Sequence, residues 1–82
     1  MRFNWDGVND AEIQAHGIER TTAEAVFRAE DFAFCPHPTI DNRWTAEGTV
    51  EGRLYRVPFS KTFPEGIRIT TAFRISSKKR RT

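Results

Sequence analysis

The alternating stretch at residues 67–75 constrains the fold of this 82-residue chain more than any other feature. Isoleucine, threonine and phenylalanine occupy its odd positions, whereas arginine, threonine and alanine occupy the even ones. Successive side chains of a β-strand point to opposite faces of a sheet, so the pattern predicts one continuous strand with one buried face. The other face of that strand then carries both Arg68 and Arg74.

Charge is strongly segregated along the chain, although the net charge is only +2. Residues 1–41 hold three basic and eight acidic side chains, and residues 42–82 hold ten basic and three acidic ones. A basic half of this kind indicates a phosphate-rich ligand such as RNA or DNA. The acidic half faces either solvent or a basic partner.

Length and composition indicate one folded domain spanning residues 1–82. A chain this short buries only about 60–65% of its unfolded surface, so its core is thin. A hydrophobic fraction of 38% and ten aromatic residues nevertheless argue against disorder. The single cysteine, Cys35, excludes an internal disulfide, and no apolar run is long enough for a signal peptide or a membrane span. We therefore expect a cytoplasmic protein with no membrane contact.

The N-terminal half predicts a strand followed by two short helices. Residues 2–5 alternate as a short strand, and Asn9-Asp10-Ala11-Glu12 has the spacing of a capping box at the start of a helix that Gly17 ends. A second helix is expected at residues 23–30 from its apolar stripe. Residues 31–35 form a possible further strand.

The C-terminal half predicts a meander of three strands, at residues 44–50, 54–59 and 67–75. Glu51-Gly52 is a plausible hairpin turn. Pro58 lacks a backbone donor, so its end of the strand lies at an edge or at a bulge. The predicted fold class is α+β: a short N-terminal strand, two short helices packed on one face of an antiparallel sheet of three to four strands, and a short basic C-terminal tail or helix.

Several short motifs together resemble the BrnT family of small bacterial ribonuclease toxins. They are Trp5-Asp6, His16-Gly17-Ile18, Ala25-Val26-Phe27, Arg43-Trp44 with Gly48 after them, Arg53 to Val57, and Ile67 to Ala72. The resemblance implies a RelE-like fold and endoribonuclease activity in a type II toxin–antitoxin pair, with RNA as substrate and no cofactor. It also implies an antitoxin partner of the ribbon-helix-helix kind, through which alone the pair contacts operator DNA.

The chain departs from the family pattern at positions that concern activity. The usual lysine and asparagine before His-Gly are replaced by Ala15 and Glu12, and a family glutamate corresponds to Lys79. The usual Ser-Ala-Arg ending of the last strand is Thr71-Ala72-Phe73 here, with Arg74 one place later and therefore on the opposite face unless a bulge intervenes. A decayed, non-catalytic module that binds RNA, DNA or a partner protein is accordingly the alternative function.

RNA cleavage without a metal proceeds by attack of the ribose 2′-hydroxyl on the adjacent phosphate, which requires proton transfer and stabilisation of the phosphorane charge. The candidate catalytic residues are His16, Arg43, Glu47, Arg68 and Arg74. The candidate RNA-binding residues are Arg53, Tyr55, Arg56, Lys78, Lys79, Arg80 and Arg81. Arg68 and Arg74 lie roughly 20 Å apart along one strand, so a single phosphate requires one of them together with a cation from another element.

Structural roles compete with several of these assignments. Glu47 is more often a cross-strand partner of Arg53 or Arg56 than a catalytic base. His16 is equally consistent with a histidine that satisfies the last carbonyls of a helix, and Tyr55 with a core aromatic. The basic tail is more often a solvated chain end. Cys35-Pro36-His37 with His16 supplies at most three ligands, fewer than a structural zinc site needs, so no metal is expected.

Overall fold

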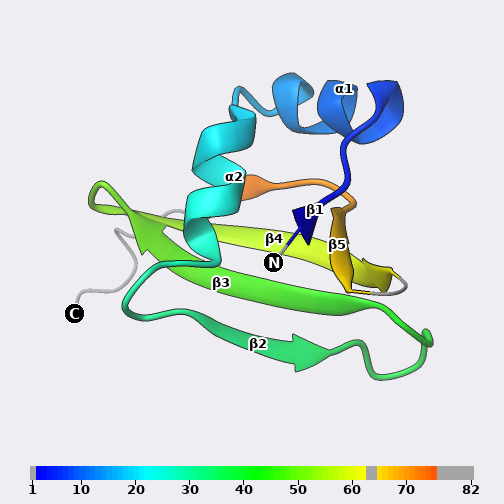
Figure 1. Ribbon diagram of the computed structural model, residues 1–82. Coiled ribbons are helices and arrows are strands. Elements are labelled where there is room, and N and C mark those ends of the chain that lie inside the picture. The colour runs from blue at the N-terminus through cyan, green and yellow to red at the C-terminus, as the bar shows by residue number, and fades with distance from the viewer. Residues whose placement is uncertain (1, 63–64, 76–82) are drawn as a thin grey trace.

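The computed structural model describes residues 2–62 and 65–75 and has the predicted α+β class (Figure 1). The elements follow in the order β1 (Arg2–Phe3), α1 (Gly7–Ala15), α2 (Arg20–Val26), β2 (Ala33–Pro36), β3 (Trp44–Val50), β4 (Arg53–Thr62), β5 (Gly66–Ile69) and β6 (Phe73–Ile75). Both helices lie on the same side of the sheet, as predicted (Figure 1). No helix in the described ranges is long and apolar enough to cross a membrane.

The sheet is larger than predicted and is mixed. Its six strands follow the order β1-β5-β4-β3-β2, and β6 pairs with the other end of β4. The possible strand at residues 31–35 is present as β2 and pairs antiparallel with β3. The expectation of three to four antiparallel strands is wrong because β1 joins the sheet parallel to β5 and the last predicted strand is divided into two. Pro36 is accommodated in β2 because the neighbouring His37 N–H donates to the Arg43 carbonyl, so the proline nitrogen faces the free edge.

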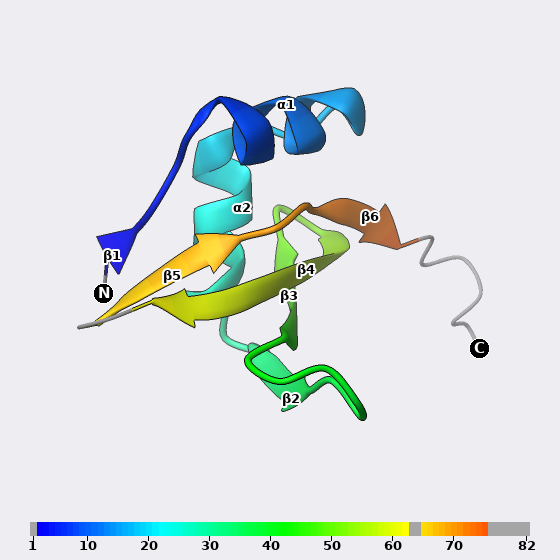
Figure 2. The same ribbon diagram turned by 90° about the vertical axis from the view of Figure 1, so that its right-hand side faces the viewer.

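The predicted single strand at residues 67–75 is broken into β5 and β6, which follow one another along β4 (Figure 2). Ile69 pairs with Phe59 and Phe73 pairs with Arg56, so residues 70–72 face only two residues of β4. Such an insertion of one residue is a β-bulge. It lies opposite Pro58, whose carbonyl accepts from the Thr70 N–H at 2.9 Å. Of the two alternatives predicted at Pro58, an edge or a bulge, the bulge is observed, and β4 continues past Pro58 to Thr62.

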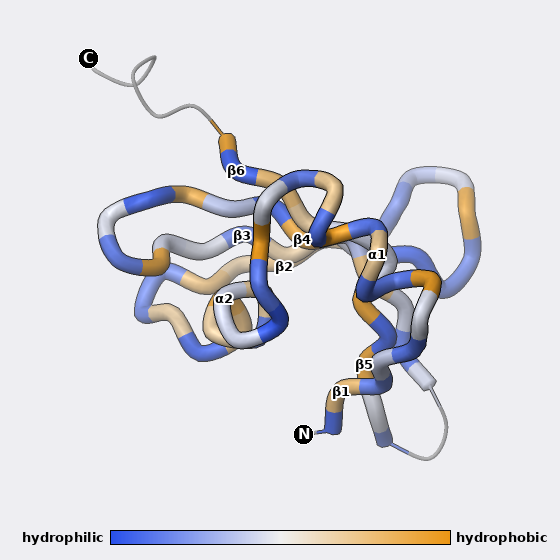
Figure 3. The backbone as a smooth tube through the Cα atoms, turned by 90° about the horizontal axis from the view of Figure 1, so that it is seen from above, coloured by the Kyte–Doolittle hydropathy of each residue, from blue (hydrophilic) through white to orange (hydrophobic). Residues whose placement is uncertain are grey.

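The bulge separates the two arginines that were expected to share a face. Arg68 pairs with Ser60 and Arg74 pairs with Tyr55. Positions 55 and 60 of β4 differ by an odd number, so their side chains point to opposite faces. β6 has an apolar, a hydrophilic and an apolar residue in turn (Figure 3). Because of the bulge, its apolar residues point to the opposite face of the sheet from the isoleucines of β5.

Helix α1 begins three residues before the predicted capping box. Asp6 is the cap: its carboxylate accepts from the N–H groups of Val8 at 2.8 Å and Asn9 at 3.1 Å. Asn9 completes the box by accepting from the Asp6 N–H at 2.8 Å, and its amide also donates to the carbonyls of Asn4 and Ile69. Asn9 thus joins β1, α1 and β5. The helix ends at Ala15 with His16 as its C-cap, and Gly17 follows with a φ of 71°, a left-handed conformation that favours glycine.

Helix α2 packs closely on β3 because Gly48 has no side chain. A Cβ at Gly48 would lie 2.8 Å from the Val26 carbonyl oxygen.

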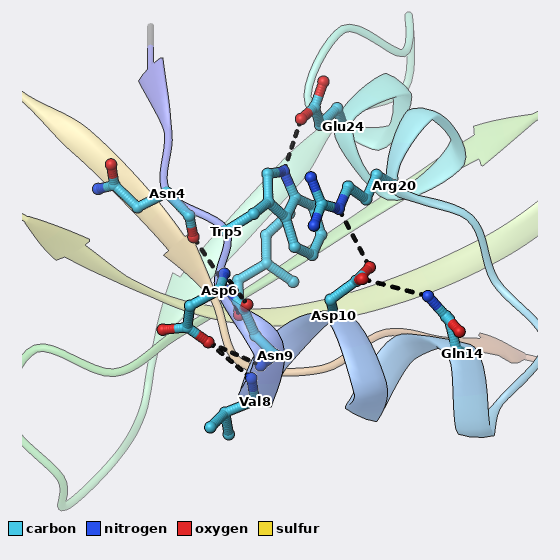
Figure 4. A network of polar contacts seen from close by, with 10 residues as sticks. Asn4, Trp5, Asp6, Val8, Asn9, Asp10, Gln14, Arg20 and Glu24 are labelled. Atoms are coloured by element: carbon cyan, nitrogen blue, oxygen red, sulfur yellow. Dashed lines mark hydrogen bonds and ion pairs between the residues drawn. The ribbon is translucent and has the colours of Figure 1, made fainter.

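The capping box expected from Thr21 to Glu24 does not form, and Glu24 instead accepts from the Trp5 indole N–H at 2.7 Å (Figure 4). The buried apolar core draws on both helices and on the sheet: Ile13, Ile18, Ala23, Val26, Phe27, Ala46, Val57, Phe59, Ile69 and Ala72.

Candidate functional site

A cavity of about 450 Å³ opens where the end of α1 meets β4 and β6. It is lined by His16, Gly17, Ile18, Arg53, Tyr55, Phe73 and Arg74. Two predicted catalytic residues, His16 and Arg74, therefore meet two predicted RNA-binding residues, Arg53 and Tyr55. We refer to this cavity as the cationic pocket.

Strand pairing brings three of these side chains together. The Glu51-Gly52 turn, in which both residues have positive φ, reverses the chain so that Arg53 begins β4. Arg53 and Tyr55 are two residues apart and share a face of β4, and Arg74 lies directly opposite Tyr55. The side chain of Tyr55 is half-buried and also packs against the core, so its predicted structural role is present as well.

His16 enters the pocket from the C-terminal cap of α1. Its backbone N–H donates to the Ile13 carbonyl at 3.0 Å. Its ring is exposed, lies 6.0 Å from the Phe73 ring centroid, and forms no hydrogen bond with any residue in the described part of the chain. The alternative in which the His16 ring satisfies helix carbonyls is not observed among these residues, and the ring lines the pocket beside Phe73.

The two guanidiniums of the pocket have no carboxylate partner among residues 2–62 and 65–75. All eleven Asp and Glu residues lie within the described residues, whose only ion pairs are Arg20–Asp10, Arg56–Glu47 and Arg68–Asp6. Arg53 and Arg74 thus present uncompensated positive charge to one cavity. A guanidinium matches two oxygens of a phosphate at once, so the pocket is suited to an anionic ligand of this kind.

Glu47 lies outside the pocket. It pairs across the sheet with Arg56, whose Nη2 and Nε lie 2.7 and 2.8 Å from the Glu47 Oε2. Neither residue lines the pocket, and Arg56 points to the opposite face of β4 from Arg53 and Tyr55. The structural alternative for Glu47 is confirmed in the described chain, and neither residue faces the ligand site.

Arg68 also lies apart from the pocket, because its guanidinium contacts the helix cap. Its Nη2 is 3.2 Å from the Asp6 Oδ2. Hydrogen bonds from the Asn9 and Val8 backbone, together with the positive charge of Arg68, hold the pKa of the Asp6 carboxyl below its ordinary value. Arg68 therefore supports the junction of β5 with α1.

Arg43 precedes β3 at the end of the sheet remote from the pocket. Val50, at the other end of β3, pairs with Arg53. The seven residues of β3 span roughly 20 Å at about 3.3 Å per residue, too far for Arg43 and Arg53 to hold one phosphate. The predicted tail residues Lys78, Lys79, Arg80 and Arg81 lie outside the described residues.

Phe73 is the functional lining residue that sequence reasoning missed. Phe73 was predicted to be one of the apolar positions of a continuous strand, and the bulge places it beside His16 instead.

No group of three or more His, Cys, Asp or Glu side chains capable of holding a metal occurs in residues 2–62 and 65–75. The chemistry available in the pocket is phosphate binding by two arginines, proton transfer or hydrogen bonding by His16 and Tyr55, and ring contact by Phe73.

No protein-family model matches the chain, and comparison with curated proteins finds no match. The fold and the pocket define a class: a small α+β protein with a cationic cavity at one end of its sheet.

Proposed function

We propose that the protein is an endoribonuclease that cleaves RNA in the cationic pocket without a metal. One observation supports the proposal: Arg53 and Arg74 line the same cavity as His16 and pair with no Asp or Glu in the part of the chain that the structure describes. A phosphodiester bound between the two guanidiniums has its charge neutralised, and an imidazole is at hand for proton transfer.

The reaction divides among the pocket residues as follows. Arg53 and Arg74 bind the non-bridging oxygens of the scissile phosphate and stabilise the added charge of the phosphorane. His16 accepts the proton of the attacking 2′-hydroxyl as its oxygen bonds to phosphorus. Water protonates the 5′-oxygen as the P–O5′ bond breaks, which leaves a 2′,3′-cyclic phosphate and a 5′-hydroxyl. Tyr55 orients the phosphate by hydrogen bonding, and the Phe73 ring offers a surface for a base. Glu47 has no part, because Arg56 holds it elsewhere.

The order of elements supports membership of the RelE-like class. A strand, two helices and a meander follow one another, and β5 returns beside β1. Together with the motifs that resemble BrnT, this supports a toxin of a type II toxin–antitoxin pair. On this proposal the protein acts in the cytoplasm, a ribbon-helix-helix antitoxin inhibits it, and operator DNA is bound only through that antitoxin.

The cleavage test uses a 5′-labelled single-stranded RNA and a matched RNA with one 2′-deoxyribose at the cleavage position. The proposal predicts that the deoxy substitution abolishes cleavage at that position. It also predicts that EDTA does not change the rate of cleavage of the all-ribose RNA. His16→Ala and Arg74→Ala reduce the rate by about 10²-fold or more, whereas Arg56→Ala, a matched surface arginine outside the pocket, leaves it unchanged. Cleavage that is insensitive to the deoxy substitution contradicts the mechanism.

RNA binding without cleavage is the second candidate. It is favoured by the absence of any Asp or Glu among the pocket-lining residues, which leaves the ring of His16 and the hydroxyl of Tyr55 as the proton-transfer groups. This candidate predicts intact RNA after prolonged incubation and equal affinity for the two RNAs above. Arg74→Ala then weakens binding although no product forms in any sample.

A further inference from the structure

A second cavity, of about 510 Å³, lies at the opposite end of β4 from the cationic pocket. Phe32, Phe34, Phe59 and Ile67 form its apolar walls, and Lys61 and Glu65 are among its polar residues. We refer to it as the aromatic groove. Its residues take no part in the proposed RNA chemistry, so an inference drawn from it stands independently of that function.

The groove leaves a large aromatic surface uncovered. Phe34 is 51% exposed and is one of only three large hydrophobic residues exposed in the described chain. Its ring lies 5.6 Å from that of Phe32 and 5.7 Å from that of Trp44. Trp44 in turn stacks on Phe59, with ring centroids 6.5 Å apart. An aromatic array that continues from the core to the surface is held rigidly and is ready to bury an apolar group.

Lys61 is fixed above this surface at two points. The side chain of Asn42 forms two hydrogen bonds with the backbone of Lys61, as a residue of a neighbouring strand would. The amide nitrogen donates to the Lys61 carbonyl at 2.8 Å, and the amide oxygen accepts from the Lys61 N–H at 3.0 Å. The Lys61 ammonium lies 4.0 Å from the Trp44 ring centroid and 6.0 Å from that of Phe34. It forms no ion pair with any Asp or Glu, so it is a pre-positioned cation.

The backbone edge beside the groove is poorly suited to adding another strand. β2 is the edge strand and has only four residues. Its outward-facing backbone positions are those of Phe34 and Pro36, and Pro36 has no N–H to donate. Any partner at this surface is therefore held by side-chain contacts rather than by strand addition.

The charges of the groove indicate what kind of partner fits. Lys61 is positive and Glu65 is negative, and neither has an ion-pair partner in the described chain. A nucleic acid would bring phosphates against Glu65 and would gain only one cation. A peptide with an apolar side chain for the aromatic walls, an acidic residue for Lys61 and a basic residue for Glu65 satisfies every group of the groove.

We propose that the aromatic groove is a docking site for a protein partner, which inserts a large apolar or aromatic side chain flanked by one acidic and one basic residue. The groove buries the apolar side chain against Phe34 and Phe59, while Lys61 and Glu65 set the direction of the bound segment. Occupation of this site leaves the cationic pocket open, because the two lie at opposite ends of the sheet.

The test titrates ¹⁵N-labelled full-length protein with the blocked tripeptide acetyl-Glu-Phe-Lys-amide and follows backbone amide shifts. Saturable shifts are expected at Phe34, Lys61 and Ile67 and not at Arg53 or Arg74. Phe34→Ala weakens binding about tenfold because an apolar contact is lost. Lys61→Gln changes an exposed side chain and leaves the core intact. It weakens peptide binding about threefold, which corresponds to the loss of one exposed ion pair.

Two control probes make the outcome decisive. Acetyl-Glu-Ala-Lys-amide, which lacks the aromatic ring, is expected to bind at least about tenfold more weakly. Equal binding of the alanine peptide overturns the proposal, as does the absence of shifts at groove residues in the folded wild-type protein. A single-stranded oligouridylate is the second probe: if it shifts Phe34 and Lys61 while the phenylalanine peptide does not, the groove binds nucleic acid and the protein-docking proposal is wrong.

Discussion

Tyr55 on β4 lies directly opposite Arg74 on β6, and this pairing exists because residues 70–72 face only two residues of β4. Without the bulge, the regular register of β5 would place Phe73 opposite Tyr55 and would turn Arg74 to the other face. The extra residue thus turns Arg74 to the face of the sheet that carries Arg53 and Tyr55. A local irregularity of the backbone creates the charge distribution of the cationic pocket.

Gly48→Ala is predicted to destabilise the protein by about 1–3 kcal/mol, because overpacking displaces α2 from β3. The added methyl group would meet the Val26 carbonyl oxygen at 2.8 Å and the Ala29 Cβ at 2.9 Å. Urea unfolding measures the change. Gly7→Ala is the matched control: no atom lies within 4 Å of a Cβ there, and alanine favours the helix, so its stability stays equal or rises. Equal losses in both variants would contradict the close packing at Gly48.

Asn9→Ala is predicted to lower the free energy of unfolding by about 2–4 kcal/mol. Asn9 is 1% exposed and joins three segments by hydrogen bonds to Asp6, Asn4 and Ile69. Its loss leaves the carbonyl of Ile69, in a buried position, and that of Asn4, in a partly buried one, without this donor. Gln14→Ala serves as control: this exposed helix residue donates only to Asp10, and its replacement changes stability by no more than about 0.5 kcal/mol. A loss at Asn9 no larger than that at Gln14 would rule out its bridging role.

Stability is predicted to fall as the pH drops below the ordinary carboxyl pKa of 3.8. Side-chain and backbone hydrogen bonds from Thr49 lower the pKa of Asp31, and the side-chain hydrogen bond from Arg20 lowers that of Asp10. A lowered folded-state pKa stabilises the protein above the unfolded value, and this contribution is lost as pH falls through the folded value. Asp31→Asn should therefore flatten the acid side of a plot of unfolding free energy against pH. An unchanged slope would show that the Asp31–Thr49 contact is not linked to folding.

The parts of the fold that follow from local patterns could be predicted from the sequence. Trp44–Val50 was predicted with its observed bounds because alternation and the Glu51-Gly52 turn lie close together in the chain. The start of α1 was predicted three residues too late, because the sequence offers two overlapping capping-box patterns, one that begins at Asp6 and one that begins at Asn9. Only the burial of Asn9 against Ile69, 60 residues away, selects the first of them.

The candidate site was only partly predictable for a similar reason. Side-chain type identified Arg53, Tyr55, Arg74 and His16, but their convergence depends on the bulge, which leaves composition and period almost unchanged. Arg68 was placed with Arg74 on the assumption of an unbroken strand. Its true partner, Asp6, is distant in sequence and carries no signal that singles it out from the other acidic residues.

The central claim is that Arg53 and Arg74 together bind a phosphate. Its most direct test is the affinity of a single-stranded RNA for wild-type, Arg53→Ala, Arg74→Ala and Arg56→Ala proteins across a series of salt concentrations. Each pocket variant should bind about tenfold more weakly and reduce the salt dependence by about one phosphate contact, while Arg56→Ala stays within about twofold of wild type. Equal losses in all three variants, or unchanged affinity in the pocket variants, would contradict the assignment of this cavity as the RNA site.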